Sequence, residues 1–201
     1  MKMPFKSGFR VSSPYGWRID PLTGERAWHS GIDLVGADRD VLAAVGGSVL
    51  KSRIVTDRTD ATWEWGNYVS VFGDDGRIYY YCHLAERTAE AGGRIEVGQR
   101  VGIEGATGRV TGVHLHFEVR NPSNYGTQDP AEILGIPNES GYVWKPVAPY
   151  IEQASPWAAD AVAWAVEKGI LKGRGGDDYA LQEPITREEI CVMLHRCREV
   201  L

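Results

Sequence analysis

Four of the five histidines in the chain lie in three short patterns whose residue types suit a metal site. In the first pattern, His29 and Asp33 are four residues apart with Gly31 midway, and in the last, His114 and His116 are two residues apart. If these segments are strands, side chains alternate between two faces, so each pair shares a face. Two imidazoles and one carboxylate, with a fourth position open, are typical of a catalytic zinc site.

The opposite face of each segment is apolar: Trp28, Ile32 and Leu34 in the first, and Leu115, Phe117 and Val119 in the last. Each segment is therefore predicted to have one polar face that carries ligand atoms and one apolar face that is buried in a core. Because Gly31 has no side chain, we expect it to leave room for an ion. A peptidase also needs a base and an oxyanion donor, and two further imidazoles are available for these roles.

Composition excludes several classes of protein. The net charge of −5, from 22 basic and 27 acidic residues, argues against a nucleic-acid-binding protein, which needs a basic face. No apolar run approaches the ~20 residues of a membrane span, and residues 1–8 lack the apolar region of a signal peptide. The three cysteines are too few for a disulfide framework, and we expect Cys82, Cys191 and Cys197 to be small buried apolar residues.

Residues 1 to about 120 are expected to be rich in strands. The aromatic and β-branched runs 68–72 and 77–83 flank a Gly-Asp-Asp-Gly turn, which predicts a hairpin. The fold class predicted is mainly β, a glycine-rich antiparallel sheet with short hairpins. We assign residues 1–137 to this domain and the proline-containing residues 138–154 to a linker.

Residues 155–201 are predicted to form a small α-helical module. Ser155-Pro156 is a helix start signal, and Gly169 is expected to end that helix. Thr186 and Glu189 have the spacing of a capping box, in which each side chain bonds the backbone amide of the other residue.

The histidine patterns resemble those of the lysostaphin and LytM-type peptidoglycan zinc endopeptidases, from about Ser13 to Arg120. The matching segments are Ser13–Arg18 followed by Asp20-Pro21, His29–Asp33, Trp65–Val69, Tyr81–Leu84, Gly105–Gly108 and Thr111–Val119. The resemblance implies that Zn²⁺ is bound by His29, Asp33 and His116. It also implies that His114 is the catalytic base and that His83 stabilises the developing charge.

One position departs from the family pattern. Cys82 stands where a small residue, often glycine, is usual, and it is expected to narrow the groove without removing a catalytic group. A base with the ordinary imidazole pKa of about 6.5 would lose activity at roughly pH 5 to 6.5.

The C-terminal segment resembles one S-layer homology repeat through Trp157-Ala158, Trp164-Ala165, Gly169–Gly173 and Ile185–Glu189. This resemblance implies binding to a secondary cell-wall polysaccharide, with Arg187 and Trp157 as the contact residues. Glu188 stands where alanine is usual. Because such repeats usually act in threes, a helical appendage that only packs is the alternative.

The sequence therefore predicts a zinc metalloendopeptidase that hydrolyses peptide stems or cross-bridges of bacterial peptidoglycan, in the cell wall or outside the cell. Without a signal peptide, a phage or prophage endolysin is one expectation, and another export route or a missing leader are the others. One rival is a catalytically silent wall-binding protein that activates another cell-wall hydrolase. A second rival is a structural wall-attachment protein. Silent relatives are recognised by lost ligands, whereas here all five site residues are present.

Overall fold

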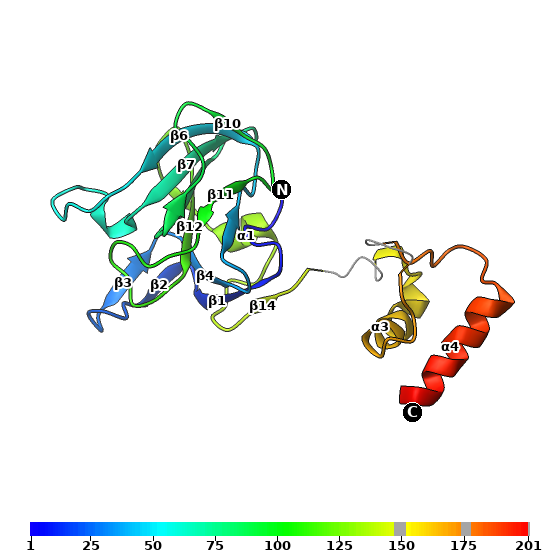
Figure 1. Ribbon diagram of the computed structural model, residues 1–201. Coiled ribbons are helices and arrows are strands. Elements are labelled where there is room, and N and C mark those ends of the chain that lie inside the picture. The colour runs from blue at the N-terminus through cyan, green and yellow to red at the C-terminus, as the bar shows by residue number, and fades with distance from the viewer. Residues whose placement is uncertain (147–151, 174–177, 201) are drawn as a thin grey trace. The chain divides into compact units, whose positions relative to one another are not determined.

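The computed structural model describes residues 1–146, 152–173 and 178–200 and divides the chain into two compact units (Figure 1). The first, Met1–Lys145, is built mainly from antiparallel strands, and the second, Pro146–Leu201, contains helices. This architecture confirms the predicted fold class.

The strands of the first unit are short. In chain order they are β1 (Phe9–Ser13), β2 (Gly16–Ile19), β3 (Arg26–His29), β4 (Ile32–Gly36), β5 (Asp40–Leu42), β6 (Gly47–Arg53), β7 (Tyr68–Gly73), β8 (Ile78–Cys82), β9 (Glu86–Arg87), β10 (Arg94–Ile95), β11 (Arg100–Ile103), β12 (Leu115–Arg120), β13 (Thr127–Gln128) and β14 (Val143–Trp144). A 3₁₀ turn, η1 (Trp63–Trp65), and a helix, α1 (Pro130–Leu134), complete the unit.

The largest sheet has the order β10-β6-β7-β8-β12-β4-β1-β14, and β13 also pairs with β12. A second sheet has the order β5-β11-β9, and β2 pairs with β3 as a separate hairpin. Strand β12 thus lies between β8 and β4, which brings together segments from three distant parts of the chain.

The predicted hairpin is confirmed by the pairing of β7 with β8. Alternation along β8 divides its tyrosines between two apolar clusters. Tyr79 and Tyr81 lie in the main core with Phe117, whereas Tyr80 and Cys82 pack in a second cluster with Tyr68. Cys82 is fully buried there, so it does not narrow the groove.

Trp28 does not join the core, contrary to the prediction. Its side chain is 49% exposed, whereas Ile32 and Leu34 are buried as expected. The reason is that the predicted strand is interrupted after His29: β3 pairs only with β2, and one face of this hairpin is open to solvent. Trp28 and Trp17 pack edge to face on that open side, with ring centroids 5.6 Å apart.

The first unit extends past residue 137, the end assigned to it from the sequence. Residues Val143 and Trp144 form β14, which pairs with β1, and the Trp144 ring stacks on Phe9 at 5.4 Å. This pairing places residues 138–145 of the assigned linker in the first unit. The start of α1 shows ordinary capping: Asp129 accepts a hydrogen bond from the amide of Ala131, and Pro130 is the first helical residue.

In the second unit, the 3₁₀ turn η2 (Pro156–Ala158) leads into α3 (Ala159–Glu167), and α4 (Arg187–Val200) follows. The capping box is confirmed, because the Thr186 amide donates to Glu189 Oε2 and the Glu189 amide donates to Thr186 Oγ1. Cys191 is exposed on α4, contrary to expectation. This small unit buries little: Ile170 is its one buried apolar side chain among the described residues.

In the part of the chain that the structure describes, none of the helices has both the length and the apolar character that crossing a membrane requires.

Candidate metal centre and pocket

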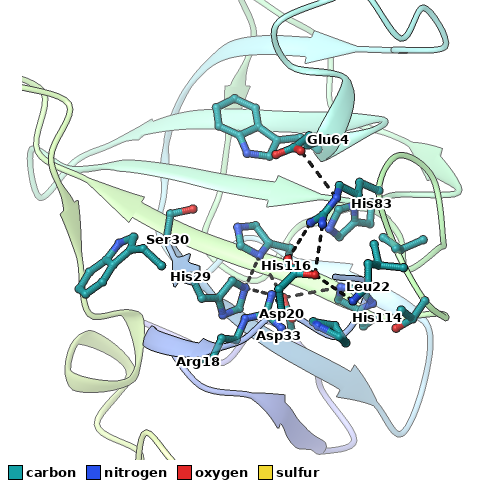
Figure 2. Close-up of a pocket in the computed structure, with 16 residues that line it drawn as sticks. Arg18, Asp20, Leu22, His29, Ser30, Asp33, Glu64, His83, His114 and His116 are labelled. Carbon is teal, nitrogen blue, oxygen red and sulfur yellow. Dashed lines mark hydrogen bonds and ion pairs between the residues drawn. The ribbon is translucent and has the colours of Figure 1, made fainter. Parts of the chain in front are cut away.

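The register of β12 brings the candidate residues together. His116 lies opposite Asp33 of β4 on one side and opposite Cys82 of β8 on the other. His83 directly follows β8, and His29 ends β3 just before β4 begins. Figure 2 shows His29, Asp33, His83, His114 and His116 around one pocket.

Three potential donor atoms converge in this pocket. His29 Nε2 lies 3.1 Å from both Asp33 Oδ1 and His116 Nδ1, and His116 Nδ1 lies 2.9 Å from Asp33 Oδ1. Tetrahedral ligation with bonds of about 2.0–2.1 Å would place donors roughly 3.3 Å apart. The set of one carboxylate and two imidazoles therefore fits a zinc ion with only small adjustments.

In His29 and His116, the ring nitrogen that does not face the cluster is close to a hydrogen-bond acceptor. His29 Nδ1 donates to the Pro14 carbonyl oxygen at 2.7 Å, and His116 Nε2 lies 3.3 Å from Glu118 Oε2. An ionised carboxylate can only accept, so Nε2 of His116 carries the hydrogen. His29 Nε2 and His116 Nδ1 are then the nitrogens left to face the cluster, as metal ligation requires.

Glu118 is a buried side chain in contact with the cluster that the sequence reasoning missed. It is fully buried, and it also accepts hydrogen bonds from Ser30 Oγ at 2.6 Å and from Arg120 Nε. Burial alone would raise the pKa of Glu118, but the bonds from His116, Arg120 and Ser30 bring it below the usual value. The signal was present in the sequence, because Glu118 alternates onto the same strand face as His116.

Gly31 makes room for an imidazole rather than directly for an ion. A Cβ atom at Gly31 would lie 2.8 Å from His116 Nε2 and 2.6 Å from the Phe117 carbonyl oxygen. The missing side chain therefore lets the His116 ring approach the chain between His29 and Asp33.

His83 and His114 lie beside this cluster, with ring centroids 4.8 Å apart. His83 Nδ1 is 2.9 Å from the Thr107 carbonyl oxygen, and His114 Nδ1 is 3.0 Å from the Gly112 carbonyl oxygen. Each Nδ1–H therefore donates to the backbone, which leaves Nε2 of both neutral rings as an acceptor.

The two rings differ in backbone and position. His83 has φ of 64°, a left-handed conformation that is uncommon for a residue with a side chain and that is found at functional sites. His114 Nε2 lies 3.6 Å from Asp33 Oδ1. His114 directly precedes β12, where it forms an isolated antiparallel bridge with Gly105, and it lines the same pocket as His116.

The titration of these groups follows from burial and charge. Burial lowers the pKa of His83 to about 3, helped by repulsion from His116 and His114, and burial also lowers the pKa of His114. Burial would lower the pKa of His116 as well, but its bonds to Asp33 and Glu118 raise it to about 9. Burial would raise the pKa of Asp33, yet hydrogen bonds from His116 and His29 hold it well below the usual value.

The pocket has a volume of about 150 Å³ and a wall that the sequence reasoning did not assign. This wall includes Arg18, Asp20, Glu64 and Arg109. Arg109 donates to both carboxylate oxygens of Asp20, at 2.9 and 3.1 Å. Arg18 approaches Asp33 Oδ2 only to 3.9 Å.

The two residues predicted to contact polysaccharide are both exposed in the second unit. Trp157 is 89% exposed in η2, and Arg187 is exposed at the start of α4. Within the described ranges, no hydrogen bond or ring contact joins them.

Residues 27–130 match the model of peptidase family M23. The chain belongs to this family. Residues 151–191 match the S-layer homology domain model. The family assignment confirms the resemblance drawn from the histidine motifs and gives the chain a peptidase fold.

Among curated relatives, the peptidoglycan DD-endopeptidase ShyC of Vibrio cholerae is 36% identical over 110 residues, which are 54% of this chain and 24% of ShyC. The chain thus spans about a quarter of that relative's length. The catalytic domain of lysostaphin from Staphylococcus simulans has a TM-score of 0.54 at 26% identity, covering 63% of this chain and 92% of that domain.

A second solved structure is the catalytic domain of EnpA, a prophage-encoded M23 protein from Enterococcus faecalis, in the form of a point mutant. It gives a TM-score of 0.51 at 26% identity, covering 61% of this chain and 88% of that one.

The contact between Glu118 and His116 predicts an effect on metal affinity. In Glu118→Gln, the amide must face both Arg120 and the His116 ring, and one of its two ends presents a donor where an acceptor is needed. We expect the affinity for added Zn²⁺ to fall by about 10- to 100-fold, as measured by competition with a chelator.

Glu104→Gln is the matched control, because Glu104 is also a buried glutamate but bonds the Gly36 amide instead of a site residue. Equal zinc affinity in Glu118→Gln and the wild type would refute the orienting role of Glu118.

Proposed function

We propose that the chain is a zinc metalloendopeptidase that hydrolyses peptide stems or cross-bridges of bacterial peptidoglycan. The observation that carries the proposal is the convergence of three donor atoms and two acceptor imidazoles in one pocket of an M23 peptidase. The naming of ShyC as a peptidoglycan DD-endopeptidase supports the substrate class.

In this proposal, His29, Asp33 and His116 hold the zinc ion. When bound, the ion supplies Lewis-acid polarisation of the scissile carbonyl and lowers the pKa of water. The chain orients the donors through the Pro14 carbonyl and Glu118, and it keeps Asp33 ionised.

We assign the base to His114. Its Nε2 is an acceptor in the resting state and lies 3.6 Å from Asp33, so it can take a proton from water beside the cluster. His83 is an acceptor in the same state. His83 can stabilise negative charge by donating from Nε2 only when that nitrogen is protonated. We therefore expect His83 to act after His114 or His83 has taken up a proton.

The presence of all five site residues argues against the rival hypothesis, a catalytically silent wall-binding protein that activates another hydrolase. Such a protein does not need metal-ligand histidines that are oriented by further hydrogen bonds. It also does not need two imidazoles whose second nitrogen is left as an acceptor. Here both features are present around one pocket.

We propose further that the second unit is a wall-binding module that keeps the enzyme in the cell wall, outside the cell. The match of residues 151–191 to the S-layer homology domain model supports this role. The exposed side chains of Trp157 and Arg187 are the proposed contacts for a secondary cell-wall polysaccharide.

A narrower version of the proposal is a phage or prophage endolysin. The similarity to prophage-encoded EnpA supports it. Expression in a bacterial cytoplasm should then lyse cells only when a pore-forming protein opens the membrane, and lysis without that protein would contradict this version.

Two substitutions separate metal binding from catalysis. His116→Ala should lose bound zinc, because it removes one of three donors. His114→Ala should keep zinc and fold but lose peptidoglycan hydrolysis by roughly 100-fold or more, because it removes only the base. Metal analysis and release of soluble peptides from purified walls measure both effects. Full zinc retention in His116→Ala would sink the ligand assignment, and an active His114→Ala would move the base to His83.

The acid limit of activity should lie below the ordinary histidine pKa of about 6.5. Burial lowers the pKa of His114, so the ring stays neutral and able to accept a proton as the pH falls through 6.5. A nearby zinc ion would push this pKa in the same direction. We expect half-maximal kcat/KM below pH 6.5 with zinc still bound. Loss of activity at or above the ordinary histidine pKa of about 6.5, or together with the metal, would contradict this assignment.

Wall binding can be tested without disturbing the pocket. The double variant Trp157→Ala/Arg187→Ala should sediment less with intact cell walls, while its hydrolysis of a soluble stem peptide should match the wild type. Arg198→Ala is the control, because Arg198 is exposed on the same helix α4. Unchanged sedimentation of the double variant would favour the alternative, in which the second unit is a helical appendage that does not bind the wall.

A further inference from the structure

The two arginines of the pocket wall differ in what holds them. Arg109 is bound by both oxygens of Asp20 and lies 3.8 Å from Glu64. Arg18 donates no hydrogen bond to any residue that the structure describes, and its one ion pair there is the 3.9 Å approach to Asp33 Oδ2. We propose that Arg18 binds a substrate carboxylate next to the scissile peptide bond. This inference rests on the peptidase function proposed above and adds a substrate selectivity to it.

The hairpin points Arg18 towards the site. In the pairing of β2 with β3, Gly16 lies opposite His29 and Arg18 lies opposite Ala27. Because alternate residues share a face, Arg18 and His29 project from the same face of the hairpin. Figure 2 shows Arg18 beside His29 and Asp33. Its side chain is 22% exposed, which leaves the guanidinium accessible from the pocket.

Charge favours an anion at this position. With zinc bound, the ion contributes two positive charges, Asp33 cancels one, and Arg18 adds another. The neighbouring buried acids do not cancel this charge, because Asp20 is paired with Arg109 and Glu118 with Arg120. Glu64, the remaining acid of the pocket wall, subtracts at most one charge, and its side chain is 71% exposed. The site therefore has an excess of positive charge that a substrate carboxylate would balance.

The geometry suits a carboxylate close to the reacting bond. The carboxylate carbon of the residue after a scissile bond lies within roughly 4 Å of the scissile carbonyl carbon, given standard backbone bond lengths. Arg18 lies beside a proposed zinc ligand, so a bond held at the metal position brings that carboxylate to the guanidinium. The planar fork of arginine binds both carboxylate oxygens at once.

The test compares stem-peptide dimers purified from peptidoglycan with the same dimers after their carboxyl groups have been converted to methylamides. The wild type should hydrolyse the untreated dimers with a kcat/KM about 10- to 100-fold higher. Arg18→Gln should lose this preference and cleave both at the rate that the wild type shows on the amidated dimers. Arg26→Gln is the matched control, because Arg26 lies on the same hairpin but covers the Trp17 ring at 4.8 Å.

Two readouts without turnover accompany the kinetics. Zinc-loaded His114→Ala should bind the untreated dimers more tightly than the amidated dimers in calorimetry, and adding Arg18→Gln should remove the difference. Arg18→Gln alone should keep zinc affinity within about threefold of the wild type. A larger loss of zinc would mean that Arg18 holds Asp33 in place, and it would overturn the proposal.

The remaining outcomes separate the two proposals. If the wild type cleaves both forms of the dimer equally, or if Arg18→Gln slows both equally, carboxylate recognition by Arg18 is wrong and the peptidase function stands. If the wild type cleaves neither form, the proposed function itself fails, and the inference fails with it.

Discussion

A positive charge held between two buried carboxylates is the interaction on which the site depends. The His116 ring lies between Asp33, 2.9 Å from Nδ1, and Glu118, 3.3 Å from Nε2. Both acids are ionised, but Glu118 is already paired with Arg120, whereas Asp33 has only the 3.9 Å approach of Arg18 besides the histidines. A neutral His116 ring would therefore leave the charge of Asp33 poorly compensated. A proton meets this need in the metal-free protein, where the pKa of His116 is raised to about 9. A zinc ion at Nδ1 would meet the same need, so metal and proton compete for one place.

The sheet provides this arrangement through a single strand register. Strand β12 sets His116 opposite Asp33 on β4 and next to the end of β8, where the chain turns into His83. A slip of one residue would exchange the faces of β12 and place Phe117 in the pocket. The core resists such a slip, because Phe117 packs against Tyr79 and Tyr81 on the other face. Apolar packing on one side of the sheet thus fixes the polar cluster on the other.

Much of this site could be predicted from the sequence, since alternation along a strand assigns side chains to faces. The same rule applied to residue 118 would have added the buried acid to the set. The rule failed at Trp28, because it assumed one continuous strand where the chain breaks between β3 and β4. His83 and His114 are hydrogen-bonded to the backbone carbonyls of Thr107 and Gly112. Every residue has a backbone carbonyl, so these acceptors could not be predicted from residue types.

The hydrogen bonds of the pocket divide its walls by function. His83 and His114 each donate Nδ1–H to a backbone carbonyl, so one wall offers two acceptors and no free imidazole N–H in the resting state. The wall near His29 offers the opposite, a guanidinium from Arg18 that donates to none of the described residues. If Arg18 binds a substrate carboxylate and His114 is the base, as proposed, the anionic end of the substrate would lie at the cationic wall and the proton released by water would go to the acceptor wall. The electrostatics of the two walls would then favour one direction of the substrate before any close packing is needed.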